Sequence, residues 1–91
     1  MRNIEIDCRN INSPKALQIY IQYRLDFPEW YGRNLDALYD MLTTNAYPVC
    51  LTIVTGPEMN EEMKTYISRL MRVIQDAARE NETLTYKLIE K

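Results

Sequence analysis

Strand-like segments alternate with helix-like segments along this chain, and this alternation constrains the fold more than any other feature. Residues 2–8 alternate between apolar and polar side chains, residues 49–54 form a nearly continuous β-branched apolar run, and residues 84–89 form a last strand pattern. Strands that are separated by helices favour a parallel sheet with right-handed crossovers. We therefore predict an α/β fold of order β-α-α-β-α-β, with three strands and with helices covering mainly one face of the sheet.

Each predicted helix begins at a residue suited to capping. Ser13 before Pro14, then Asn34, then Asn60 occupy the expected N-cap positions. Asn81 is expected to end the third helix as a left-handed C-terminal cap. Helical periodicity predicts these core-facing side chains: Leu17, Tyr20, Ile21, Leu25, Leu35, Leu38, Met41, Leu42, Met63, Ile67, Leu70, Met71, Ile74, Ala77 and Ala78.

Size and composition indicate a single domain over residues 1–91. With 46% apolar and 26% charged residues, the chain can bury a core and stay in solution. The longest uncharged run, residues 41–57, contains polar side chains and prolines, so we do not expect it to span a membrane. The N-terminus has no apolar signal core, and we therefore expect a cytoplasmic protein. Cys8 and Cys50 could pair if their strands were neighbours, but reduced thiols are the favoured interpretation.

The chain lacks the residues on which most enzymes depend near neutral pH. It contains no histidine, which removes the usual general base and the commonest metal ligand. It has only two glycines, no phosphate-binding glycine loop and no cysteine pair at zinc spacing. We therefore expect no enzymatic activity, no cofactor and no metal, and we interpret the chain as a binding protein.

The candidate functional segment is residues 28–40, PEWYGRNLDALYD. Its loop sets two large aromatic residues directly before a helix that carries two carboxylates one turn apart. On a helical wheel, the side opposite the core stripe shows Asp36, Tyr39, Asp40 and Thr43. An exposed face of this kind beside an aromatic loop indicates a surface for a macromolecular partner.

Charge is distributed unevenly along the chain. Between Arg33 and Lys64 there are five acidic residues and no lysine or arginine, although the net charge of the whole chain is only −2. An acidic face repels phosphate backbones, so direct binding to nucleic acid is disfavoured. The same face attracts and steers a basic protein.

Residues 25–49, LDFPEWYGRNLDALYDMLTTNAYPV, resemble the barstar family, intracellular inhibitors of the secreted bacterial ribonuclease barnase. The family pattern L-x-x-P-x-x-Y-G-x-N-L-D-A-L-x-D is complete here, and the expected order of elements also matches. The resemblance implies a three-stranded parallel sheet, and 1:1 binding to a guanyl-specific extracellular ribonuclease. It also implies that an acidic helix enters the active site, where a carboxylate takes the place of an RNA phosphate.

The resemblance assigns a partner-binding role to specific positions. Asp40 is the central anchor, Trp30 and Tyr31 match paired loop aromatics, and Asp76 and Glu80 fall at the rim. The full implied set is Trp30, Tyr31, Gly32, Asn34, Asp36, Tyr39, Asp40, Thr43, Asp76 and Glu80. Gly32 is expected to supply a left-handed turn that aims the aromatics.

Each of these assignments has an alternative that needs no binding partner. The loop aromatics could fold onto the core, the acids of residues 36–40 could form an ordinary solvated face, and Asp76 and Glu80 could make weak salt bridges with nearby arginines. The chain also departs from the family: Arg33 adds a positive charge to the loop, Tyr39 replaces a tryptophan, and the link at residues 44–46 is one residue shorter. A second hypothesis is therefore a barstar-like interaction module for another basic partner or toxin nuclease domain.

Overall fold

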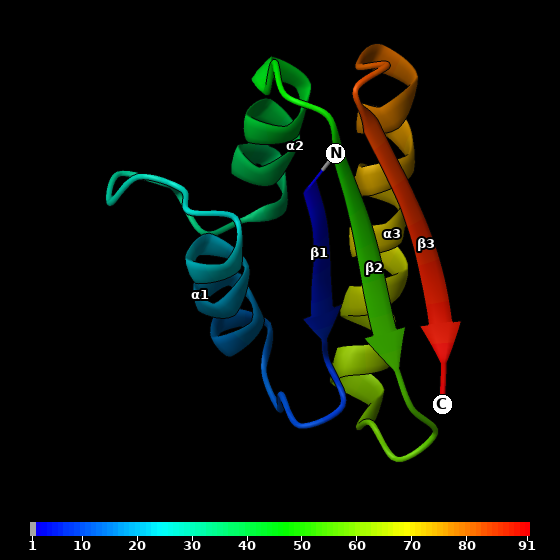
Figure 1. The fold of residues 1–91 in the computed structure, drawn as a ribbon. Coiled ribbons are helices and arrows are strands. Elements are labelled where there is room, and N and C mark those ends of the chain that lie inside the picture. Colours follow the sequence, from blue (N-terminus) through cyan, green and yellow to red (C-terminus); the bar gives the residue numbers. More distant parts are fainter. Residues whose placement is uncertain (1) are drawn as a thin grey trace.

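A computed structural model of the chain describes residues 2–91. Its elements are β1 (Arg2–Asp7), α1 (Pro14–Arg24), α2 (Leu35–Thr44), β2 (Val49–Thr55), α3 (Glu61–Glu80) and β3 (Leu84–Glu90). The strands form one parallel sheet in the order β1-β2-β3, so each strand lies beside its neighbour in sequence (Figure 1). The predicted order and the parallel α/β fold are confirmed, with strand ends that differ from the prediction by one residue.

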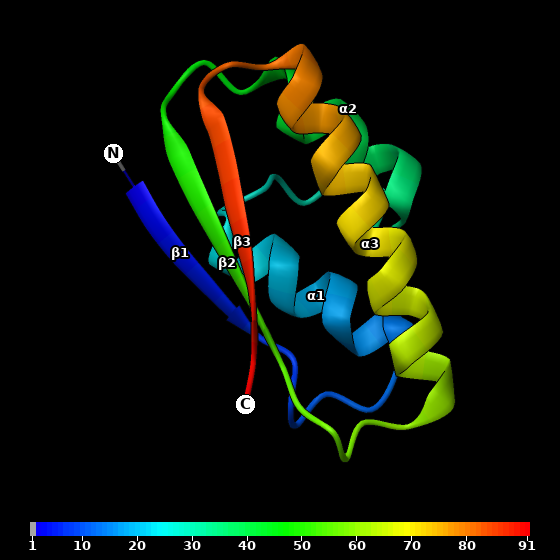
Figure 2. The same cartoon turned by 90° about the vertical axis from the view of Figure 1, so that its right-hand side faces the viewer.

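All three helices lie on the same side of the sheet (Figure 2). Alternation along β1 turns Ile4 and Ile6 toward the helices, and the register places Leu51 and Ile53 of β2 beside them. The helices contribute most of the remaining core: Leu17, Ile21, Leu38, Leu42, Met63, Ile67, Leu70, Ile74 and Ala77. The other predicted core residues, Tyr20, Leu25, Leu35, Met41, Met71 and Ala78, are partly buried at the margin of this cluster.

The three predicted N-caps are confirmed. Side-chain oxygens of Ser13, Asn34 and Asn60 accept the backbone N–H three residues later, at 3.1, 2.7 and 2.8 Å. Each bond satisfies one of the N–H groups that a helix leaves without a partner in its first turn. Because such bonds are local, they could be predicted from sequence.

The predicted role of Asn81 is wrong in its geometry. Its φ is −135°, an extended conformation, so it is no left-handed cap. The side chain is buried and its Nδ2 donates to the carbonyl oxygens of Leu42 and Asn45, each at 2.8 Å. Asn81 therefore satisfies the carbonyl end of α2 and holds the end of α3 beside it.

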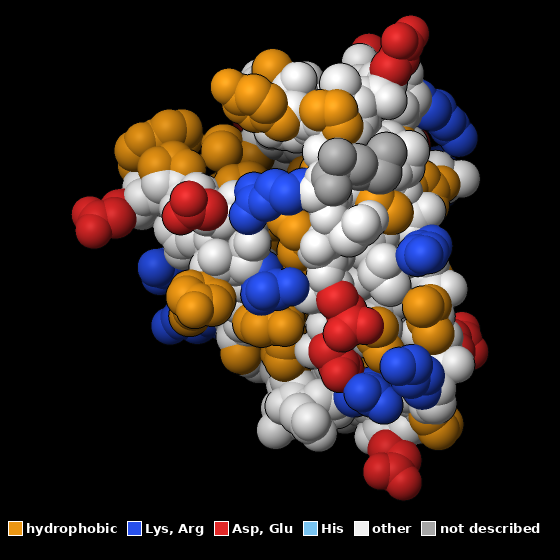
Figure 3. Space-filling view, viewed as in Figure 1, with side chains coloured by type: hydrophobic (Ala, Val, Ile, Leu, Met, Phe, Trp, Pro, Cys, Tyr) orange, Lys and Arg blue, Asp and Glu red, His pale blue; other side chains and the backbone are white. Residues whose placement is uncertain are grey.

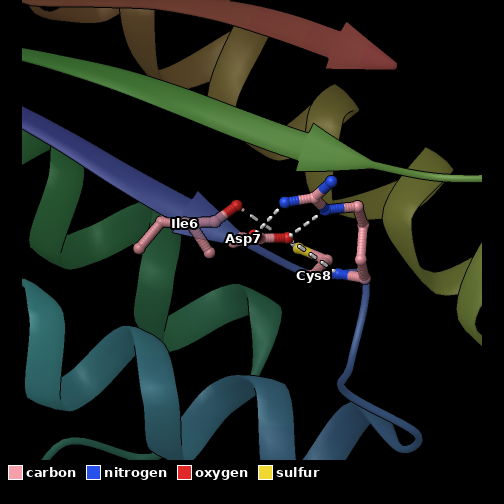
Figure 4. A network of polar contacts seen from close by, with 4 residues as sticks. Ile6, Asp7 and Cys8 are labelled. Carbon is pink, nitrogen blue, oxygen red and sulfur yellow. Dashed lines mark hydrogen bonds and ion pairs between the residues drawn. The ribbon is translucent and has the colours of Figure 1, made fainter. Parts of the chain in front are cut away.

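A polar network closes the end of β1 (Figure 4). The Asp7 carboxylate accepts from Nε, Nη2 and the backbone N of Arg9, at 3.0, 2.8 and 3.1 Å. These hydrogen bonds lower the pKa of Asp7 to about 2. Burial raises the pKa of the neighbouring Cys8 thiol to about 12, so this thiol stays protonated at neutral pH.

The two cysteines are free. Cys50 lies opposite Asn3 in the sheet, whereas Cys8 follows the end of β1 five residues further on. At about 3.3 Å per residue this separation is about 16 Å, far beyond the reach of a disulfide. The interpretation as unpaired thiols is confirmed. Among residues 2–91, no helix has the length and apolar character needed to cross a membrane.

Candidate protein-binding surface

The outer face of α2 carries the two predicted carboxylates. Asp36 and Asp40 are exposed, and neither forms an ion pair with any residue in the described range 2–91. Tyr39 and Thr43 are half-buried beside them. The Thr43 hydroxyl donates to the Tyr39 carbonyl at 2.9 Å, so it is already engaged within the helix. The acids are thus free for a partner, on a helix whose Leu38 is buried in the core.

The loop between α1 and α2 extends away from the body of the protein (Figure 1). A turn closes when the Tyr31 N–H donates to the Pro28 carbonyl at 3.0 Å, and Gln22 Nε2 donates to the same oxygen at 2.8 Å. Trp30 lies within this turn with 78% of its surface exposed. An aromatic side chain so placed is available as a contact for another macromolecule.

Tyr31 does not share that exposure. It is only 4% exposed, and its ring lies 4.8 Å from that of Phe27 between ring centroids. Its hydroxyl donates to Gln18 Oε1, and Gln18 Nε2 donates to the Tyr66 hydroxyl at 2.8 Å. Burial raises the Tyr31 pKa. The expectation of a second loop aromatic at the surface is corrected here: Tyr31 anchors the loop to α1 and α3.

The left-handed backbone conformation expected of Gly32 is found at Arg33 instead. Among residues 2–91 no glycine has positive φ, and Arg33 has φ 55° instead. The expected left-handed Gly32 is therefore wrong. Gly32 is constrained by space, because an added Cβ would lie 3.2 Å from the Ala37 Cβ and 3.4 Å from Asn34 Nδ2. This close approach lets the loop run tightly into the first turn of α2.

The predicted rim residues lie at the end of α3. Asp76 forms ion pairs with Arg72 at 4.0 Å and Arg79 at 3.5 Å, whereas Glu80 is exposed and makes no ion pair with the residues described. Because Asn81 joins the ends of α2 and α3, Asp76 and Glu80 lie on the helix end next to the end of α2. The salt bridges expected of Asp76 in the simpler interpretation are present.

Two buried polar residues hold this surface together: Gln18 was missed from sequence, and Asn81 was predicted only as a cap of its own helix. Gln18 is 1% exposed and Asn81 is 8% exposed. Gln18 follows Leu17 and precedes Ile21 by three residues, so its place on the apolar stripe of α1 was the available signal. Its partners, Tyr31 and Tyr66, are distant in sequence and could not be read from spacing.

The open face of the sheet differs from the α2 face. Figure 3 shows acidic and basic side chains intermixed over the strands on this side. Lys87 and Glu5 both point out from this face. A mixed surface of this kind carries no single-sign field that would steer a charged protein.

Comparison with known proteins agrees with this arrangement. Residues 1–89 match the family described as Barstar (barnase inhibitor). The chain is also 38% identical over 81 residues to a Bacillus subtilis (strain 168) protein named "Putative ribonuclease inhibitor YrdF", a match that covers 88% of this chain and 89% of that protein. With the fold, the surface and both matches in agreement, the chain belongs to the barstar (barnase inhibitor) family.

Proposed function

We propose that this protein is an inhibitor of a secreted, barnase-like ribonuclease and acts in the cytoplasm of the cell that makes it. It binds 1:1 and blocks the active site with the outer face of α2. The observation that carries the proposal is the exposed Asp40, which has no ion pair in residues 2–91 and lies on a helix held at both ends. Membership of the barstar family supports it.

The chemistry is that of a phosphate mimic. An enzyme that cleaves RNA must hold a phosphate with cationic groups, and a carboxylate presented there forms charge-assisted hydrogen bonds with the same groups. Asp40 occupies the phosphate position in this proposal, and Asp36 adds a second charge one turn earlier. The protein performs no catalysis and needs no cofactor. It inhibits because it excludes the substrate.

The remaining predicted residues either contact the enzyme or shape the surface that does. Trp30 contacts the enzyme from the loop and Tyr39 from the helix, while Glu80 and the paired Asp76 lie at the rim. Gly32, Asn34 and Tyr31 shape and anchor the loop, and Thr43 stays bonded within α2. Acidic steering would speed the capture of a basic enzyme that threatens the RNA of the cell.

The test is a titration of the purified protein into a guanyl-specific microbial ribonuclease while RNA cleavage is followed. The wild-type protein should give a sharp 1:1 endpoint. Asp40→Ala should raise the inhibition constant by about 30-fold or more, the effect of losing a hot-spot contact of about 2 kcal/mol. Glu62→Ala, which removes an exposed acid from the start of α3, is the matched control and should inhibit like the wild type.

Competition separates active-site blocking from binding elsewhere. Inorganic phosphate or a short oligonucleotide should weaken inhibition, because each competes for the cationic site. If inhibition persists undiminished in Asp40→Ala and is indifferent to both competitors, the acidic helix is not the blocking element. The chain would then inhibit through another face. An absence of inhibition by the wild type would favour the second hypothesis, an interaction module for another basic partner or toxin nuclease domain.

A further inference from the structure

A basic hollow adjoins the acidic face of α2. It has a volume of about 430 Å³ and lies between the first turn of α1, the first turn of α2 and the middle of α3. Lys15, Arg33 and Arg69 line it, together with the single carboxylate of Asp36. Three cations and one acid leave the hollow with a net charge of +2. This charge is opposite in sign to that of the neighbouring outer face of α2, which carries Asp36 and Asp40.

None of the three cations, Lys15, Arg33 and Arg69, is paired with a carboxylate within the described residues. The hydrogen bonds of the described residues also include none from the Lys15 ammonium or the Arg69 guanidinium, whereas Arg72 and Arg79 on the same helix pair with Asp76. Cations without an ion pair, gathered from α1, from the loop before α2 and from α3, can bind an anion from outside.

Arg33 has the geometry of a prepared binding group. Its Nε donates to Gln22 Oε1 at 2.7 Å, which fixes the guanidinium, while its two terminal nitrogens bond to none of the residues described. A guanidinium held in this way can bind a carboxylate with two parallel N–H donors. Arg33 also has φ 55°, a conformation that is costly for a residue other than glycine or asparagine. The loop therefore holds a strained backbone conformation at Arg33, the residue that carries its positive charge.

We propose that this hollow binds an aspartate or glutamate side chain of the ribonuclease, and that Arg33 thereby determines which ribonucleases the protein captures. The inference rests on the proposed function, because the hollow shares Asp36 with the α2 face. A bound enzyme would present its cationic site to Asp40 and an acidic residue at the edge of that site to Arg33. An enzyme with a basic residue at this edge would be repelled.

An RNA phosphate fits the hollow less well than a protein carboxylate. A nucleic acid strand would have to pass Asp36 inside the hollow and Asp40 one turn away, and both repel a polyanion. A single side chain from a folded protein can enter beside Asp36 without bringing further negative charge. The charges around the hollow therefore favour a protein partner.

Three variants test the proposal in the same ribonuclease titration. Arg33→Asn removes the charge with a residue that tolerates left-handed backbone, and Arg33→Glu reverses it. Lys87→Glu, on the open face of the sheet, makes the same change in net charge far from the hollow. Arg33→Glu should raise the inhibition constant by about 10-fold or more and Arg33→Asn by less, while Lys87→Glu should stay within the roughly fivefold that an exposed charge is worth.

Salt dependence tests whether the effect of Arg33→Glu on inhibition is electrostatic. The difference between wild type and Arg33→Glu should shrink when NaCl is raised from about 0.15 to about 1 M, since the screening length falls from about 8 to about 3 Å. Emission from Trp30, the single tryptophan, should match the wild type in all variants. The midpoint of urea unfolding should match the wild type in Lys87→Glu and shift only slightly in the Arg33 variants, which lose the exposed hydrogen bond to Gln22. A loss that follows the unfolding midpoint and ignores salt would mean that Arg33 is structural, which overturns the proposal.

The outcomes separate this inference from the proposed function. If wild type inhibits and both Arg33 variants behave like Lys87→Glu, the hollow binds nothing in the complex and only this inference fails. If wild type leaves RNA cleavage unaffected, the proposed function fails and this inference with it. If fluorescein-labelled single-stranded RNA binds the isolated protein and Arg33→Glu abolishes that binding, the hollow is a phosphate site and the protein carboxylate is excluded.

Discussion

At the scale of single residues, neighbouring aromatics in the same motif take opposite positions. Trp30 is exposed within the turn of residues 28–31, while Tyr31 is buried against Phe27. Tyr31 can be buried because Gln18 Oε1 accepts a hydrogen bond from its hydroxyl, and a buried hydroxyl without a partner would be costly. The exposed ring is left for the partner, and the buried one fixes the loop that presents it.

Tyr31→Phe should destabilise the protein by about 1–3 kcal/mol. The change removes only the hydroxyl, so it leaves the buried Gln18 Oε1 without its donor. Urea unfolding measures the loss. Tyr23→Phe is the matched control, since Tyr23 is 80% exposed and should change stability by less than about 0.5 kcal/mol. Equal midpoints for the two variants would show that the Tyr31–Gln18 hydrogen bond contributes nothing to the fold.

At the scale of elements, α2 is secured at both of its ends. Asn34 caps the first turn. At the other end, Asn81 of the segment after α3 donates to the carbonyls of Leu42 in the last turn and of Asn45 just beyond it. Leu38 and Leu42 bury the inner face between these points. A helix held in this way presents its carboxylates in one orientation, which lowers the ordering cost of binding.

Asn81→Ala should cost about 1–3 kcal/mol of stability, because the buried Leu42 carbonyl would lose its partner across the α2–α3 contact. The exposed Asn10 provides the comparison, and Asn10→Ala should be nearly neutral in the same urea experiment. Hydrogen exchange should also rise at the end of α2 in Asn81→Ala. An unchanged exchange rate there would contradict a clamping role.

At the scale of the whole molecule, the helices cover one face of the sheet and leave the other to solvent (Figure 2). This leaves room for polar side chains on the open face, including Asp7 at the end of β1. Its pairing with Arg9 fastens the chain where it leaves the sheet for α1. The pair therefore links the protonation of one carboxyl to the stability of the folded state.

The contribution of Asp7 should be lost in acid. Its pKa is lowered from 3.8 to about 2 by folding, so the stabilisation is fully present above about pH 4 and disappears as pH falls through about 2. Urea unfolding of wild type and Asp7→Asn between pH 6 and 2 should give a stability difference that shrinks over the lower part of this range. Glu5→Gln, on the same strand, controls for the change in charge. A difference that stays constant down to pH 2 would rule out this linkage.

The sequence by itself determined the strand and helix order, the three N-caps and the exposed acids of α2. Each depends on periodicity or on a bond between residues three positions apart, so the local sequence contains both partners. The family pattern of residues 25–49 added the kind of partner to expect.

Only the tertiary structure decided which aromatic of the loop is buried, where Asn81 donates, and that Arg33 rather than Gly32 takes the left-handed conformation. Gln18 is hydrogen-bonded to Tyr66, 48 residues away in the sequence, and Asn81 is hydrogen-bonded to Leu42, 39 residues away. The basic hollow likewise brings together Lys15 of α1, Arg33 of the loop before α2 and Arg69 of α3. These features depend on how separate elements pack, and the pairing of distant polar groups is settled only when folding removes them from water.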